Sequence, residues 1–148
     1  MPNKDKSAVV DSVKRALDKR PEISFAYLHG SFAKDGDFRD IDVAVYVKDL
    51  PASPLEYEIA LETGIMQTVA GYPVDVRVLN NAPLSFKYHV IKEGLTLIVR
   101  NDDTRSDFQE ATLAQYFDFA PFRALYLKET LGIGALTLTK SGKSPRRY

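Results

Sequence analysis

The stretch from residue 40 to residue 47, DIDVAVYV, alternates branched apolar residues with residues of other kinds. In a β-strand, successive side chains point to opposite faces, so this alternation predicts a strand with one wholly apolar face. Such a strand must belong to a sheet that buries that face under helices. The apolar face would carry Ile41, Val43, Val45 and Val47, and the other face Asp40, Asp42, Ala44 and Tyr46.

Other segments predict further strands and helices in alternation. Apolar residues at helical spacing, Pro and Gly stops and short β-rich runs define them. We expect strands at 23–28, 74–79 and 95–100, and helices at 7–19, 55–70, 83–92 and 103–131, with Pro121 kinking or dividing the last helix. This order predicts an α/β (α+β) fold, one mixed β-sheet with flanking helices and a C-terminal helical segment.

Length and composition favour one domain. The chain has 148 residues with 45% hydrophobic and 27% charged, and we expect a folded domain over 1–131 and a flexible basic tail over 132–148. Lys plus Arg and Asp plus Glu both number 20, so net charge does not indicate nucleic acid or a membrane as partner. The sequence has no cysteine, no apolar run long enough to span a bilayer and no secretory leader, which favours a cytoplasmic location.

The two acidic residues of the alternating strand predict a metal site. Asp40 and Asp42 are two apart, so both carboxylates leave the same face of the strand, about 7 Å apart. Their mutual repulsion is relieved by a cation, and oxygen ligands of this kind suit Mg²⁺ together with substrate phosphates. Asp75 has the same phase in the strand at 74–79. If the two strands are neighbours, all three carboxylates converge, as two-metal phosphoryl or nucleotidyl transfer requires.

A Gly-Ser pair precedes the acids. Glycine lets a backbone approach a phosphate closely, and Ser31 adds a hydroxyl donor, so Gly30 and Ser31 predict a triphosphate-binding turn. Lys34 and Arg39 lie in the following loop, where phosphate contact and simple solvation are both open.

The run GSFAKDGDFRDIDVAVYV resembles the signature of the DNA polymerase β-like nucleotidyltransferases, and PVDVRVLN supplies the third acid. Size and motif position resemble the minimal nucleotidyltransferases (MNT proteins), with DFQEATLAQYFDFAPFRALYL similar to their C-terminal helices. The resemblance covers residues from about 8 to about 130. The spacer FAKDGDFR is shorter than is usual in the family, and Arg39 stands where a Ser is common.

The resemblance implies roles for these residues. Asp40 and Asp42 would bind Mg²⁺, Asp75 would be the third ligand and a base for the attacking hydroxyl, and Gly30 with Ser31 would hold the triphosphate of ATP. The resemblance further implies that the chain is an antitoxin that pairs with a HEPN ribonuclease toxin and transfers AMP from ATP to a tyrosine of that toxin. Two alternatives stay open: transfer to a small molecule such as an antibiotic, and neutralisation of a partner by binding alone.

Other conspicuous residues have simpler interpretations. His29 and His89 are expected to be structural, and Arg77 can pair with Asp75 on its own strand face. The aromatic residues between Phe108 and Tyr126 predict core or a partner surface.

Overall fold

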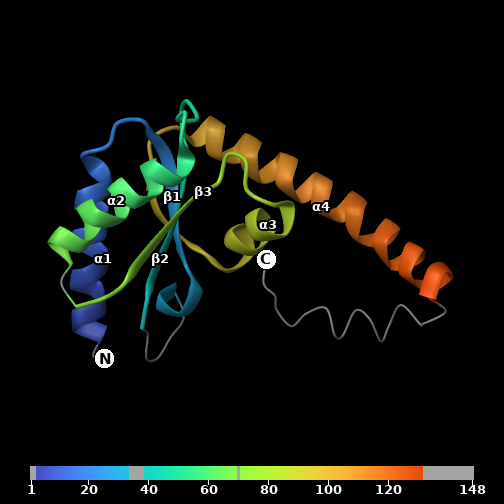
Figure 1. The fold of residues 1–148 in the computed structure, drawn as a ribbon, viewed down its shortest axis with the longest axis horizontal. Helices are drawn as coiled ribbons and strands as arrows, with labels where there is room; N and C mark the ends of the chain where they lie inside the picture. Colours follow the sequence, from blue (N-terminus) through green and yellow to red (C-terminus); the bar gives the residue numbers. More distant parts are fainter. Residues whose placement is uncertain (1–2, 34–38, 70, 132–148) are drawn as a thin grey trace.

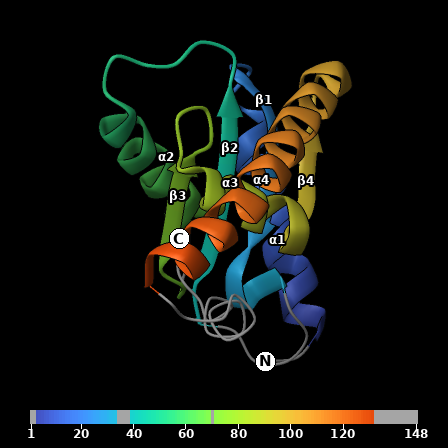
Figure 2. The same cartoon turned by 90° about the vertical axis from the view of Figure 1, so that its right-hand side faces the viewer.

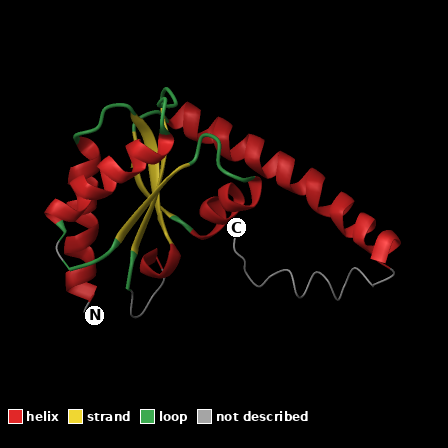
Figure 3. Ribbon diagram, in the orientation of Figure 1, coloured by secondary structure: helices red, strands yellow, loops and turns green. Residues whose placement is uncertain are grey.

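The computed structural model describes residues 3–33, 39–69 and 71–131. Helices and strands alternate, as the sequence predicts (Figure 1, Figure 3). The elements are α1 (Asn3–Asp18), β1 (Ile23–His29), the 3-10 turn η1 (Gly30–Ala33), β2 (Ile41–Val47), α2 (Pro54–Thr68), β3 (Val74–Val78), α3 (Leu84–Glu93), β4 (Leu95–Val99) and α4 (Asp102–Leu131). The tail from residue 132 and the loop from 34 to 38 lie outside the described residues.

The four strands in these described ranges form one mixed sheet in the order β3-β2-β1-β4. β1 is antiparallel to both β2 and β4, whereas β2 and β3 are parallel. A parallel neighbour needs a crossover connection, which α2 provides. The predicted fold class is confirmed, and the strand order, which the sequence did not predict, is now defined.

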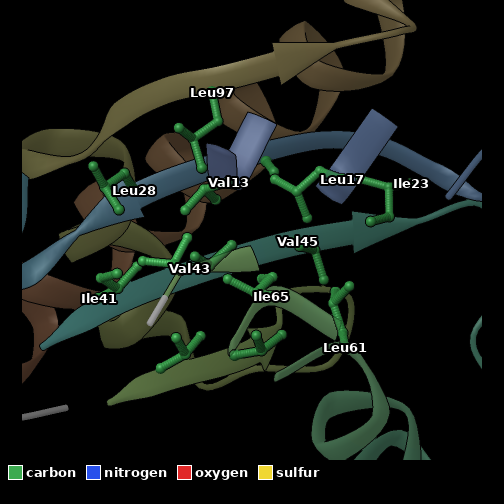
Figure 4. Packing of buried hydrophobic residues seen from close by; sticks show 14 of the residues in the cluster. Val13, Leu17, Ile23, Leu28, Ile41, Val43, Val45, Leu61, Ile65 and Leu97 are labelled. Carbon is green, nitrogen blue, oxygen red and sulfur yellow. The ribbon is translucent and has the colours of Figure 1, made fainter. Parts of the chain in front are cut away.

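Helices cover both faces of the sheet (Figure 2). On one face, α1 and α2 pack on the apolar residues of β2, with Val13, Leu17, Leu61 and Ile65 among the buried side chains (Figure 4). On the other face, Phe86 and Val90 of α3 and Phe108 of α4 pack on Phe25, Tyr27 and Ala44. The two faces of β2 are therefore divided as its alternating sequence predicts.

Two helix ends agree with their sequence signals. The Ser53 hydroxyl accepts a hydrogen bond from the Glu56 N–H (3.3 Å), and Pro54 occupies the first turn of α2. The Gly94 N–H donates to the Val90 carbonyl (2.8 Å) where α3 ends. These local contacts explain why the boundaries of α2 and α3 are readable from sequence.

Of the two predictions for Pro121, a kink or a division of the last helix, the division is wrong. α4 runs as one helix of 30 residues from Asp102 to Leu131 (Figure 1). A proline removes one backbone donor and crowds the preceding turn, but a long helix can continue past it. Within α4, Phe108 is buried in the core, whereas Phe117 is 58% exposed.

None of the helices in the described ranges is long and apolar enough to cross a membrane.

Two glutamates of α2 protect the open edge of the sheet. β3 is an edge strand, so the N–H groups of Val76 and Val78 lack a strand partner. Val76 N–H donates to Glu62 (2.9 Å), and Val78 N–H donates to Glu58 (2.8 Å). Glu58 and Glu62 are four residues apart and so lie on one face of α2. They hold β3 against the helix and block pairing with another chain.

We predict that the double variant Glu58→Ala/Glu62→Ala lowers the free energy of unfolding by about 2 kcal/mol or more, because two donors lose charged acceptors. The freed edge should also promote self-association. Urea unfolding and light scattering measure the two effects. Glu58→Gln/Glu62→Gln keeps an acceptor oxygen at each position and is the matched control. Equal urea midpoints for the alanine variant and the wild type would contradict this role.

Candidate active site

The two acidic strands are neighbours, and their acids lie side by side. Asp42 of β2 pairs in register with Asp75 of β3. Paired residues of adjacent strands point to the same face, with the strands about 4.8 Å apart. Both carboxylates therefore lie on the sheet face that α3 and α4 cover. The opposite arrangement, which would have ruled out a shared site, does not occur.

Asp40 stands at the entrance to β2. It is exposed, two residues before Asp42, and thus in the same strand phase. Its charge reaches the pair, since Asp40 is one of the groups that raise the pKa of Asp42. The three acids are coupled electrostatically even though Asp40 is solvated.

The pKa of Asp42 is raised from 3.8 to about 6. Burial is the largest cause, and repulsion by Asp75 and then by Asp40 adds to it, while Arg77 opposes the shift. A cation placed among the three carboxylates would offset both the burial and the repulsion that make Asp42 hard to ionise. The electrostatics of the site thus favour a cation.

Arg77 pairs with Asp75, as its position on the same strand face predicts. The Arg77 Nε lies 3.3 Å from Asp75 Oδ2, and both side chains are about half exposed (52% and 45%). A pair this exposed contributes little to stability because solvent screens it. Its consequence is local: it orients the Asp75 carboxylate and partly offsets the negative charge.

Gly30 is required by the close approach of Asp42. Its φ is +72°, in the left-handed region, and a Cβ built on it would overlap the Oδ2 of Asp42. Only glycine avoids both the backbone strain and this collision. The turn at the end of β1 is therefore built around the Asp42 carboxylate.

The structure describes two of the three remaining residues that are predicted to contact phosphate. The backbone of Ser31 belongs to η1, and Arg39 is exposed directly before Asp40. Lys34 lies outside the described residues. Their contact with a triphosphate stays a prediction.

His29 has a more unusual environment than the sequence suggested. Its side chain is 1% exposed, and neither Nδ1 nor Nε2 has a hydrogen-bond partner. Its ring meets Phe86 edge-on at 5.4 Å, and burial, followed by the charges of His89 and Arg77, lowers its pKa to about 4. In the sheet it stands directly opposite Asp42. The sequence could not reveal that His29 faces Asp42, because this placement depends on the pairing register of β1 and β2.

The acids fit magnesium with phosphate ligands rather than an all-protein cage. Within the described ranges, no three His, Cys, Asp or Glu side chains are close enough to hold a metal ion alone. Asp42 and Asp75 lie together, but the expected convergence of all three acids is not found. Asp75 is paired with Arg77. Mg²⁺ usually takes one or two carboxylates and completes its shell with phosphate oxygens and water, which this donor set allows.

The match to a family model defines the class of protein. The model "Polymerase beta, Nucleotidyltransferase" matches residues 11–103, from α1 to the start of α4. This range includes the Gly-Ser turn and all three acids, and it spans more than half of the chain. The chain belongs to this nucleotidyltransferase family.

Solved structures of MNT toxin-antitoxin complexes contain a fold similar to that of most of this chain. The MNT antitoxin in complex with a tri-AMPylated HEPN toxin from Shewanella oneidensis has a TM-score of 0.67 and 19% identity, covering 85% of this chain and 98% of its own. A toxin-antitoxin structure with AMP-PNP has a TM-score of 0.67 and 22% identity, covering 82% and 98%. The toxin-antitoxin MntA-HepT gives 0.65 and 19%, covering 84% and 98%. A comparison with curated proteins gave no match.

We predict that Asp42→Asn stabilises the protein at neutral pH in the absence of divalent ions. The folded state binds the Asp42 proton more tightly than the unfolded chain does, since the pKa rises from 3.8 to about 6 on folding. The contribution of Asp42 to stability therefore falls as the pH rises from about 4 to about 6 and is not regained above that range. Asparagine is uncharged throughout.

Thermal unfolding should accordingly show a higher Tm for Asp42→Asn at pH 7.5 and a difference near zero at pH 4. Asp49→Asn, a change at an exposed acid, is the control. A lower Tm for Asp42→Asn at pH 7.5 would mean that the charged carboxylate stabilises the fold.

Proposed function

We propose that this protein is a Mg²⁺-dependent adenylyltransferase that acts as an antitoxin, transferring AMP from ATP to a tyrosine of a cognate HEPN ribonuclease toxin. The observation that carries the proposal is the in-register pair of Asp42 and Asp75 beside the Gly30 turn, within a nucleotidyltransferase family domain. The choice of acceptor is supported by the MNT antitoxin structures, which are almost wholly covered by this chain.

In this proposal, Asp40, Asp42 and Asp75 would hold Mg²⁺. When bound, the ion neutralises charge on the phosphates and on the departing pyrophosphate. Gly30 gives the triphosphate close access to the backbone, and Ser31, Lys34 and Arg39 are the further phosphate contacts that we propose. The donor ATP is supported by the AMP-PNP complex of a structural relative.

The chemical step is an in-line displacement at the α-phosphate. The tyrosine oxygen forms a bond to the α-phosphorus, the bond from that phosphorus to the bridging oxygen breaks, and pyrophosphate leaves. The hydroxyl proton passes to a carboxylate, for which Asp75 is our candidate. Because Asp75 is about half exposed, an incoming acceptor can reach it. The enzyme contributes mainly by positioning the two reactants.

Modification would disarm the toxin by charge and bulk. An AMP group brings a phosphate anion to a neutral tyrosine, and an added anion near an RNA-binding surface repels the RNA backbone. Neutralisation then persists after the two proteins separate. This persistence distinguishes the proposal from inhibition by binding alone.

The test is co-expression with a candidate cognate HEPN ribonuclease toxin. We expect the wild type to rescue growth and the toxin to gain AMP units by intact mass. The variant Asp40→Ala/Asp42→Ala should fail in both assays, and Asp49→Ala, in an exposed acid next to β2, should behave as wild type.

Other outcomes of these experiments would favour one of the two alternative functions. Rescue by the double variant at equal expression, with the toxin unmodified, would indicate neutralisation by binding alone. Transfer of labelled AMP to a small hydroxylated compound with no protein acceptor would indicate a small-molecule enzyme. Parallel reactions with ATP, GTP, CTP and UTP would define the nucleotide.

A further inference from the structure

His29 is a buried polar group with no partner, which is costly. Its ring is 99% buried, with neither nitrogen hydrogen-bonded and the ring of Phe86 against it. Leaving a buried donor or acceptor unsatisfied costs about 1–3 kcal/mol, whereas an apolar group of the same shape would not incur this cost. Stability alone would favour phenylalanine at this position. An unpartnered buried polar atom calls for an explanation in function.

The position of His29 next to Asp42 suggests a functional explanation for its burial. It is the last residue of β1, it stands opposite Asp42 in the sheet, and it precedes Gly30. The Asp42 Oδ2 lies against the Cα side of Gly30, in the space that a Cβ would occupy. The imidazole and the carboxylate thus occupy one corner of the sheet, where they are cross-strand neighbours on the same face. Cross-strand partners of this kind have Cβ atoms about 5 Å apart, within reach of a hydrogen bond after a side-chain rotation.

We propose that His29 is a positioning residue whose ring N–H donates a hydrogen bond to the Asp42 carboxylate when magnesium and nucleotide occupy the site. This inference rests on the proposed function. The hydrogen bond would hold one oxygen of Asp42 and leave the other to face the cation. Carboxylates that bind metals are commonly held in this way by groups behind them.

Burial suits His29 to this role. A neutral imidazole has one N–H donor and one acceptor nitrogen, so it can hold a carboxylate without adding a positive charge that would compete with the cation. The β1–β2 register keeps the two Cα atoms opposite each other, so only side-chain torsions need to change. No strand movement is required.

The test separates a positioning role from a packing role, because the two predict opposite effects. His29→Phe should leave the urea midpoint unchanged or raise it, since it removes the unsatisfied nitrogens. The same variant should need about 10-fold more Mg²⁺ for half-maximal binding of α,β-methylene ATP in calorimetry. Should His29→Phe not fold, His29→Leu provides the apolar comparison.

Two amide variants identify the donor. His29→Asn places an N–H near the position of Nδ1, and His29→Gln places one near Nε2. We expect one of these two variants to bind the analogue at the same Mg²⁺ concentration as the wild type. That variant identifies which ring nitrogen donates the hydrogen bond to Asp42. His89→Gln, at the other histidine, is the control and should match the wild type.

Unchanged Mg²⁺ dependence in a folded His29→Phe, while the wild type binds, would overturn this inference and leave the proposed function standing. A large loss of stability with unchanged Mg²⁺ dependence would assign His29 to packing. If the wild type shows no Mg²⁺-dependent binding of the analogue, the proposed function fails and the inference fails with it.

Discussion

The parallel pairing of β2 with β3 is the interaction on which the rest of this structure depends. It sets Asp42 beside Asp75, and a shift of one residue would send Asp75 to the opposite face of the sheet. The apolar residues of both strands, buried under α1 and α2, specify that register, because slippage would expose them. The core on one face therefore determines the chemistry on the other.

At the edge of the sheet, too, residues outside the site hold an acid of the site in place. β3 carries an acid of the site and is also an edge strand, which is a weak place for a group that must be held accurately. Glu58 and Glu62 compensate by taking up the outward N–H groups of β3. Each of these two carboxylates accepts a hydrogen bond from a backbone N–H of β3.

Unfavourable features gather in one corner of the molecule. Asp42 is half-buried next to other carboxylates, His29 is buried without a partner, and Gly30 has a left-handed backbone. The half-buried carboxylate and the unpartnered imidazole each lower stability, whereas glycine adopts the left-handed turn without strain. Unsatisfied groups that cluster in this way are typical of functional sites, where a ligand supplies the missing interactions.

The sequence by itself determined the alternation of elements, the two faces of β2 and the acids that share a strand phase. These follow from local periodicity and turn residues, which depend on near neighbours in the chain. Only the tertiary structure decided the strand order, the register of Asp42 with Asp75 and with His29, and the continuity of α4 through Pro121. The strand order and the two registers depend on pairing between residues far apart in sequence, so no local pattern encodes them. The burial that raises the pKa of Asp42 and isolates His29 arises in the same way, from helices that pack on the finished sheet.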